Sequence, residues 1–201
     1  MFRKLLIALV LLIVVLVVAA DRVGAHVAAH VLAGKLETDE HLSSRPSVTI
    51  GGWPFLTQAV EGHYSDVTVR TGEAVTSDHV DLDTMTVHLM GVHIPLSKVI
   101  SGSVKTVPVD RVTGTVAITF SDLESYLTSR GITVKLSPSM TFSVANSVLT
   151  VSEHLGATGA RLTTIPVPLG GLPFRLTVTS VRVSGDGLVA SGTARDVVLG
   201  S

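Results

Sequence analysis

The chain contains no cysteine among its 201 residues. This absence excludes disulfide bonds, catalysis by a thiolate and attachment of a lipid to an N-terminal cysteine. A chain of this length can bury a core large enough for stability without disulfides. Aromatic residues are also scarce, at 4% of the sequence, whereas Val, Thr, Ser and Gly are abundant. Such a composition favours strands and turns.

An excess of basic residues is missing as well, since the sequence has 15 Lys and Arg against 16 Asp and Glu. Two of the basic residues, Arg3 and Lys4, lie at the N-terminus. Residues 21–201 therefore carry 13 basic and 16 acidic side chains, a formal charge of −3. A nucleic-acid-binding domain would show a basic stripe, and purely electrostatic attachment to anionic lipid would need clustered Lys and Arg. We expect neither.

Motifs of known enzyme chemistry are absent from the sequence. There is no Gly-x-Ser-x-Gly nucleophile elbow, no Ser-x-x-Lys and no His-Glu-x-x-His. The glycine pairs at 51–52 and 170–171 lack the pattern of a phosphate-binding loop. The sequence therefore predicts neither a catalytic residue nor a cofactor.

Eight histidines raise the question of a metal site. His26 and His30 are four residues apart in a predicted helix and share one face, but no third ligand lies near them. His88 and His93 differ in parity, which predicts that they point to opposite faces of a strand. The remaining histidines fall in predicted loops or at strand ends: His41, His63, His79 and His154. We expect no metal site.

Three acidic residues, Asp78, Asp81 and Asp83, surround His79. Asp81 and Asp83 share a strand face, with carboxylates about 7 Å apart. A calcium site or a glycosidase-like pair is conceivable at this spacing. There is no loop-type calcium motif, however, and a solvent-exposed strand face explains the acids better.

What the sequence does have is a long apolar run. Residues 5–20 contain no polar side chain and follow Arg3 and Lys4. Positive charge before an apolar run holds the N-terminus in the cytoplasm and sends the following chain across the membrane. As a helix the run spans about 24 Å, against about 30 Å for a hydrocarbon core. It is therefore either a transmembrane anchor or a signal peptide cleaved after the small residues 18–20, and residues 21–201 form one exported domain in a periplasm or cell envelope.

Beyond the run, three helical segments are predicted. Residues 21–37 continue the first helix, with Val23, Val27 and Val31 in a stripe on one face. A short apolar helix lies between Pro54 and Gly62. A third helix begins with a capping box between Ser121 and Glu124 and stops at Gly131.

The remaining patterns predict strands. The segments are 48–50, 64–71, 80–94 with a bulge near 83–84, 109–120, 132–136, 140–151, an edge strand or crossing loop at 161–169, and a hairpin of 174–183 with 188–196. The segment 109–120 alternates most clearly, with Val112, Val116 and Phe120 on one face and threonines on the other. This alternation indicates a sheet with one buried and one polar face. The fold class is α+β, with a mostly antiparallel sheet and a long N-terminal helix.

A bulky apolar cluster of Trp53, Phe55, Leu56 and Val60 lies in the short helix. An ordinary core explains such a cluster. A curved sheet on a long helix would also leave an apolar trough there, and an apolar trough beside a membrane suits acyl chains.

Several segments resemble the actinobacterial LmeA-like phospholipid-binding family, named for lipomannan elongation factor A. They are Gly51-Gly52-Trp53-Pro54-Phe55-Leu56-Thr57-Gln58, Gly62 to Val69, Thr113 to Ala117 leading to Ser121-Asp122-Leu123, and Val181 to Ala194. The resemblance covers nearly the whole chain, and its motifs are structural.

The resemblance implies a fold similar to tubular lipid-binding domains, with a curved antiparallel sheet wrapped on the helix. It also implies non-enzymatic binding of a phospholipid similar to phosphatidylinositol, support of lipomannan elongation, and an envelope glycosyltransferase as a partner. Lipid contacts are predicted at Trp53, Phe55, Leu56, Val60, Phe120 and Phe142. Two other functions stay open: a scaffold that docks envelope enzymes through the Thr-rich sheet face, and a glycolipid hydrolase that uses Asp81, Asp83 or a histidine.

Overall fold

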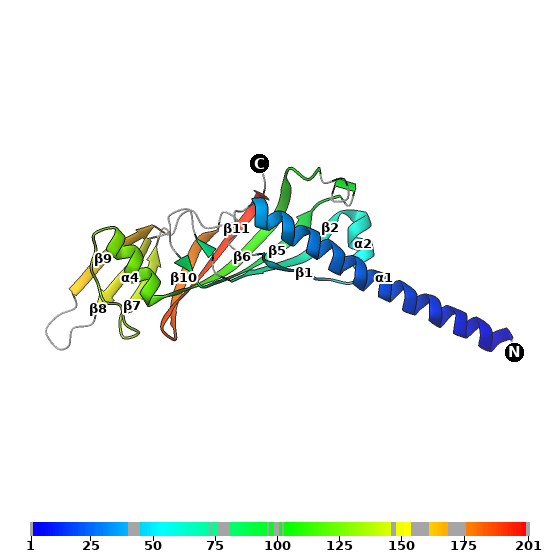
Figure 1. Cartoon of the computed structure of the whole chain (residues 1–201), viewed down its shortest axis with the longest axis horizontal. Helices are drawn as coiled ribbons and strands as arrows, with labels where there is room; N and C mark the ends of the chain where they lie inside the picture. Colours follow the sequence, from blue (N-terminus) through cyan, green and yellow to red (C-terminus); the bar gives the residue numbers. More distant parts are fainter. Residues whose placement is uncertain are drawn as a thin grey trace.

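The structure is a computed structural model that describes residues 2–39, 45–72, 74–75, 81–95, 97–98, 101, 103–145, 148–153, 161–168 and 176–199. It has the predicted α+β fold, in which a long N-terminal helix packs on a curved, unclosed antiparallel sheet (Figure 1).

The N-terminal helix α1 (Phe2–Asp39) is unbroken, as the sequence predicts. Its second half crosses the sheet, and its first half projects beyond the rest of the protein (Figure 1). Small residues let the helix approach closely, because Ala29 and Ala33 are buried. Leu32 and Leu36 pack against the same core.

The main sheet has six strands in the order β1-β2-β5-β6-β11-β10, and every neighbouring pair is antiparallel. The strands are β1 (Ser47–Ile50), β2 (His63–Thr71), β5 (Thr84–His93), β6 (Val107–Thr119), β10 (Thr177–Ser184) and β11 (Gly187–Leu199). One face carries the core, including Val87, Val112 and Val116, whereas Thr113 and Thr115 lie on the other face. The predicted one-sided sheet is therefore confirmed.

The smaller elements lie at the ends of this sheet. A helix α2 (Phe55–Glu61) precedes β2, and α4 (Phe120–Ser129) follows β6. A second sheet contains β7 (Thr141–Ala145), β8 (Val148–Glu153) and β9 (Arg161–Pro168), and a two-stranded piece contains β3 (Ala74–Val75) and β4 (Asp81–Leu82). The two ends are well separated, since α2 lies beside α1 and α4 lies with the second sheet (Figure 1).

Several predicted boundaries are wrong. The capping box of α4 joins Thr119 and Asp122 instead of Ser121 and Glu124: the Thr119 hydroxyl accepts the Asp122 N–H at 3.1 Å and donates to the Asp122 carboxylate at 2.6 Å. Glu124 instead accepts the backbone N–H of Leu136 at 2.6 Å. The helix begins earlier because Phe120, predicted as the last strand residue, is its first residue and is buried.

Two predicted strands also differ from the structure. Residues 132–136 are not in a strand, although Leu136 is buried, because their apolar side chains pack on the core without a ladder partner. The segment 140–151 is two paired strands, β7 and β8. The predicted bulge near 83–84 coincides with the break between β4 and β5, where the Asp83 N–H donates to the carbonyl of Ala117 at 3.0 Å.

In three neighbouring strands, the alternation of core-facing and outward-facing residues shifts by one position at the same point along the strands. Two positions separate consecutive core residues there instead of one: Tyr64 and Val67 in β2, Leu89 and Val92 in β5, Val109 and Val112 in β6. Gly91 lies at this point in β5, opposite Asp110 in β6, and has a φ of +66°. Glycine adopts this backbone without strain, and its missing Cβ leaves the space that the Asp110 carboxylate fills.

This parity change overturns the prediction that His88 and His93 point to opposite faces. Alternation fails at Gly91, where both Gly91 and Val92 are buried. His88 and His93 therefore both lie on the side away from the core.

Replacement of Gly91 by Ala should destabilise the protein by at least about 1 kcal/mol more than replacement of Gly185. Both glycines have positive φ, so each alanine meets the same backbone cost of about 1–2 kcal/mol. Only at position 91 does a new Cβ meet another group, the Asp110 side chain. The urea midpoints of the two full-length variants in detergent measure the difference, and equal midpoints would contradict this packing.

Candidate functional site

The helix α2 carries the apolar cluster identified in the sequence. Pro54 is its N-cap, and Gly62, at φ +69°, ends it. Phe55 and Ala59 face inward and are buried. The Phe55 ring packs against Tyr64 at a centroid distance of 6.1 Å. Burial raises the pKa of the Tyr64 hydroxyl, because ionisation would place a charge in the core.

Asp21 joins α1 to α2. Its side chain is 2% exposed, and Oδ1 accepts the backbone N–H of Leu56 at 2.8 Å. Pro54 has no side-chain group that could cap the helix, so the carboxylate from α1 satisfies one of the free N–H groups at the start of α2. The two helices also approach closely at Gly24, where an added Cβ would lie 3.2 Å from the Phe55 ring.

The outward side of α2 is apolar and open to solvent. Trp53 just before the helix is 65% exposed, Leu56 is 40% exposed and Val60 is 83% exposed. The neighbouring stripe on α1, formed by Val23, Val27 and Val31, is exposed as well. We call these six residues the apolar surface. They lie on two helices that pack against each other, and groups of exposed apolar side chains mark surfaces for contact with lipid or protein.

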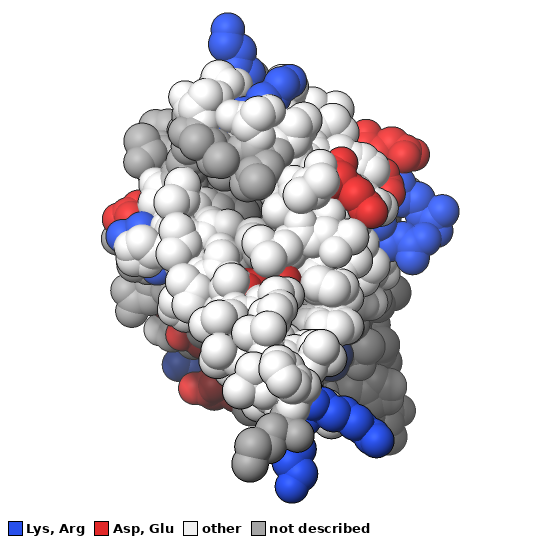
Figure 2. All heavy atoms as spheres, turned by 90° about the vertical axis from the view of Figure 1, so that its right-hand side faces the viewer, with Lys and Arg blue, Asp and Glu red and all other residues white. Residues whose placement is uncertain are grey.

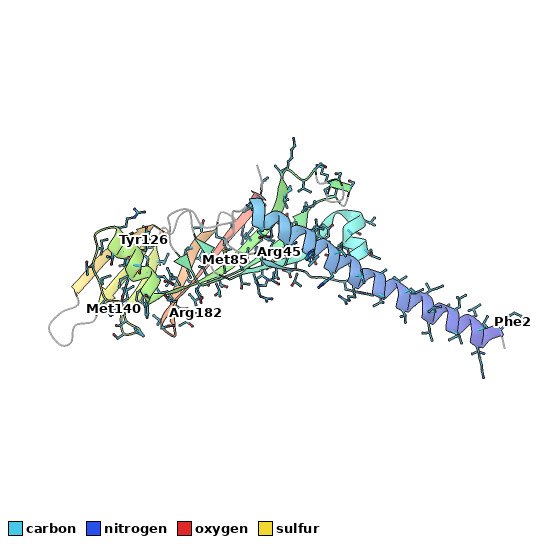
Figure 3. All side chains as sticks on the ribbon, in the orientation of Figure 1. Phe2, Arg45, Met85, Tyr126, Met140 and Arg182 are labelled. Atoms are coloured by element: carbon cyan, nitrogen blue, oxygen red, sulfur yellow. The ribbon has the colours of Figure 1, made fainter. Side chains whose placement is uncertain are left out.

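The apolar surface adjoins the projecting half of α1. From Leu5 to Val18 the large apolar side chains of this half are exposed, and Figure 3 shows them pointing outward on all sides of the helix. The segment Phe2–Gly34 is long and apolar enough to cross a membrane. Seen from this end, the molecule has mostly uncharged atoms in the middle, with acidic and basic groups toward the margin (Figure 2).

The six predicted contact residues fall into two places. Trp53, Phe55, Leu56 and Val60 lie together at α2. Phe120 and Phe142 stack at 5.7 Å at the opposite end of the sheet, beside α4 and β7. Phe120 is buried and Phe142 is half-buried against the core. Among these predicted contact residues, the exposed ones are therefore Trp53, Leu56 and Val60.

A second cluster lies on the polar face, where β2 begins and β5 ends. His63 pairs with His93 across the ladder, and their rings meet edge to face at 4.6 Å. His93 Nε2 lies 3.5 Å from Asp110 Oδ1. Asp110 also lines an adjoining cavity of about 360 Å³, together with Met90, Gly91, Arg111, Arg195 and Asp196.

The other polar residues considered in the sequence do not join this cluster. His26 and His30 are exposed on α1, as predicted for a solvated pair. His88 Nδ1 lies 3.1 Å from the Thr68 hydroxyl and 3.8 Å from the Asp66 carboxylate. Asp83 is exposed. The predictions for His41, Asp78, His79 and His154, and for the side chain of Asp81, lie outside the described residues.

Two features of these sites were not predicted from the sequence. The buried carboxylate of Asp21 caps a helix that begins 34 residues later, so no local pattern indicates its role. The meeting of His63, His93 and Asp110 depends on strand register, and no local spacing in the sequence reveals it.

Comparison with known proteins identifies a family for this chain. The family model for LmeA-like phospholipid-binding proteins matches residues 19–193. Neither the curated proteins nor the solved structures gave a match.

Replacement of Asp21 by Ala should lower the free energy of unfolding by about 1 kcal/mol, within the range of about 0.5–2 kcal/mol for a lost N-cap. Asp21→Asn is the matched control, since its amide oxygen still accepts the Leu56 N–H and should preserve most of the stability. Urea titration of the full-length chain in detergent measures both. If Asp21→Ala is as stable as the wild type, the carboxylate does not hold α2.

Proposed function

Because the chain belongs to the LmeA-like phospholipid-binding family, we propose that it binds phospholipid without catalysis, as a membrane-anchored protein of the cell envelope. In this proposal α1 spans the membrane, and the apolar surface on α1 and α2 contacts lipid where the helix leaves the bilayer. The observation that carries the proposal is the exposed apolar surface beside the projecting half of α1, whose large apolar side chains are also exposed.

The composition of the apolar surface supports contact with a bilayer. Trp53 lies exposed just before α2, and tryptophan is enriched where a membrane meets water, because its ring is apolar and its N–H polar. Leu56 and Val60 offer purely apolar contacts next to it. Exposure of three such side chains to water would be unfavourable by about 25 cal/mol for each Å² of apolar area, and acyl chains would remove that cost.

The unbroken course of α1 supports an anchor over a cleaved signal. A cut after Ala20 would fall inside a regular helix and directly before the buried Asp21. In our proposal the helix therefore stays attached and holds the apolar surface at the bilayer.

We also propose the finer assignments made from the sequence. They are a lipid similar to phosphatidylinositol, support of lipomannan elongation and an envelope glycosyltransferase as a partner. A docking module is the second candidate, favoured by the polar sheet face on which Thr68, His88, Thr113 and Thr193 are successive neighbours across four strands. Crosslinking in cells separates the two, since a dominant protein partner without bound lipid would favour docking.

Trp53 is the only tryptophan in the chain, so its fluorescence reports on one position. When the full-length protein is reconstituted in bilayers with brominated acyl chains, we expect strong quenching relative to unbrominated lipid. Bromine quenches tryptophan only at short range, so quenching requires Trp53 to lie among the acyl chains.

The matched control moves the tryptophan to the tip region of the β10–β11 hairpin, by combining Trp53→Phe with Val183→Trp. Val183 is also apolar and 37% exposed, but it lies next to Arg182, far from the projecting half of α1 (Figure 3). This variant should show little quenching. Equal and weak quenching in both proteins would contradict lipid contact at the apolar surface.

A further inference from the structure

We propose that His63, His93 and Asp110 bind one divalent transition-metal ion of the zinc class. The site is distinct from the apolar surface and does not depend on the proposed lipid function. The sequence predicts no metal site, because the three residues are separated along the chain and come together only through the order and register of β2, β5 and β6.

The distances fit coordination after small side-chain rotations. One ligand atom from each residue lies within 4.8 Å of the other two. The pair His93 Nε2 and Asp110 Oδ1, at 3.5 Å, is already close to the spacing of about 3.3 Å between ligands of a tetrahedral zinc ion. The His63 side chain is exposed, so it can turn toward the same point.

The donor set selects the class of metal. Two imidazoles and one carboxylate are the ligands that zinc and similar ions take in three-ligand sites, whereas magnesium and calcium prefer oxygen alone. Three protein ligands also leave one coordination position for water or an anionic oxygen.

The backbone holds the three side chains on one side. His63 and His93 are direct cross-strand partners, which keeps their Cβ atoms about 5 Å apart. Gly91 lacks a Cβ, so the Asp110 carboxylate can lie over β5 and reach toward His93. His63 follows Gly62, whose carbonyl accepts the Ile94 N–H at 2.8 Å. A bound ion would therefore connect the end of α2 to β5 and β6.

The test is calorimetric titration of ZnCl2 into the full-length protein in detergent, without an affinity tag and after removal of metal with a chelator. We expect one zinc ion per chain and no heat from MgCl2 under the same conditions. Zinc at about 100 times its Kd should also raise the melting temperature by about 5–10 °C. The visible absorption of Co²⁺ in place of zinc should be the intense spectrum of a tetrahedral site.

Variants locate the site. His63→Ala and His93→Ala should each weaken zinc binding at least 10-fold, and Asp110→Asn should weaken it several-fold. All three should melt like the wild type without zinc, because the side chains are exposed or half-buried. His88→Ala is the matched control: it removes a histidine from the same sheet face, outside the cluster, and should bind zinc within two-fold of the wild type. Absence of zinc binding by the wild type, unchanged binding by the His63 and His93 variants, or an equal loss in His88→Ala would overturn the proposal.

Discussion

The position of the apolar surface depends on Asp21 in the continuous helix α1. Before this residue the helix has no other part of the protein around it, and after it the helix packs against the core. The residues before this point expose apolar side chains in every direction, and those after it bury alanine and leucine against the sheet. A carboxylate at the transition is stabilised by the N–H of Leu56, so the same residue that ends the apolar run fixes the position of α2. The apolar surface therefore has a defined place relative to the projecting helix.

The sheet separates the apolar and polar parts of the molecule. Its core face receives α1, and its outer face is rich in threonine and carries the histidines of β5. The change of parity around Gly91 places His93 on the outer face, where strand register brings it beside His63 and Asp110 at the end of the sheet next to α2. The apolar surface and the cluster of His63, His93 and Asp110 thus lie near the same end of the protein but on different elements. Substitutions can therefore test each of them separately.

Much of the fold was predictable because its signals are local. The unbroken apolar run, the alternation in Val109–Phe120 and the glycine turn at 185–187 are each legible within a few residues, and they predict α1, β6 and the β10–β11 hairpin. The start of α4 was misplaced because two overlapping capping patterns are present, and burial of Phe120 selects the earlier one.

The candidate sites were less predictable because they depend on tertiary structure. The exposure of Trp53 and burial of Phe55, two residues apart, follow from which side of α2 meets α1 and Tyr64. His88 and His93 lie on the same face of the sheet because Gly91 has a positive φ. Counting alternate residues along the sequence cannot predict this. The partner of Asp21 lies 35 residues along the chain.

In the proposed function, α1 acts both as an anchor and as part of the surface that contacts lipid. Native mass spectrometry of the protein released from its own cell membranes tests both properties on one molecule. We expect a species that retains residues 1–20 and carries bound phospholipid. A species that begins at Asp21, or an intact chain that carries no lipid, would contradict the proposal.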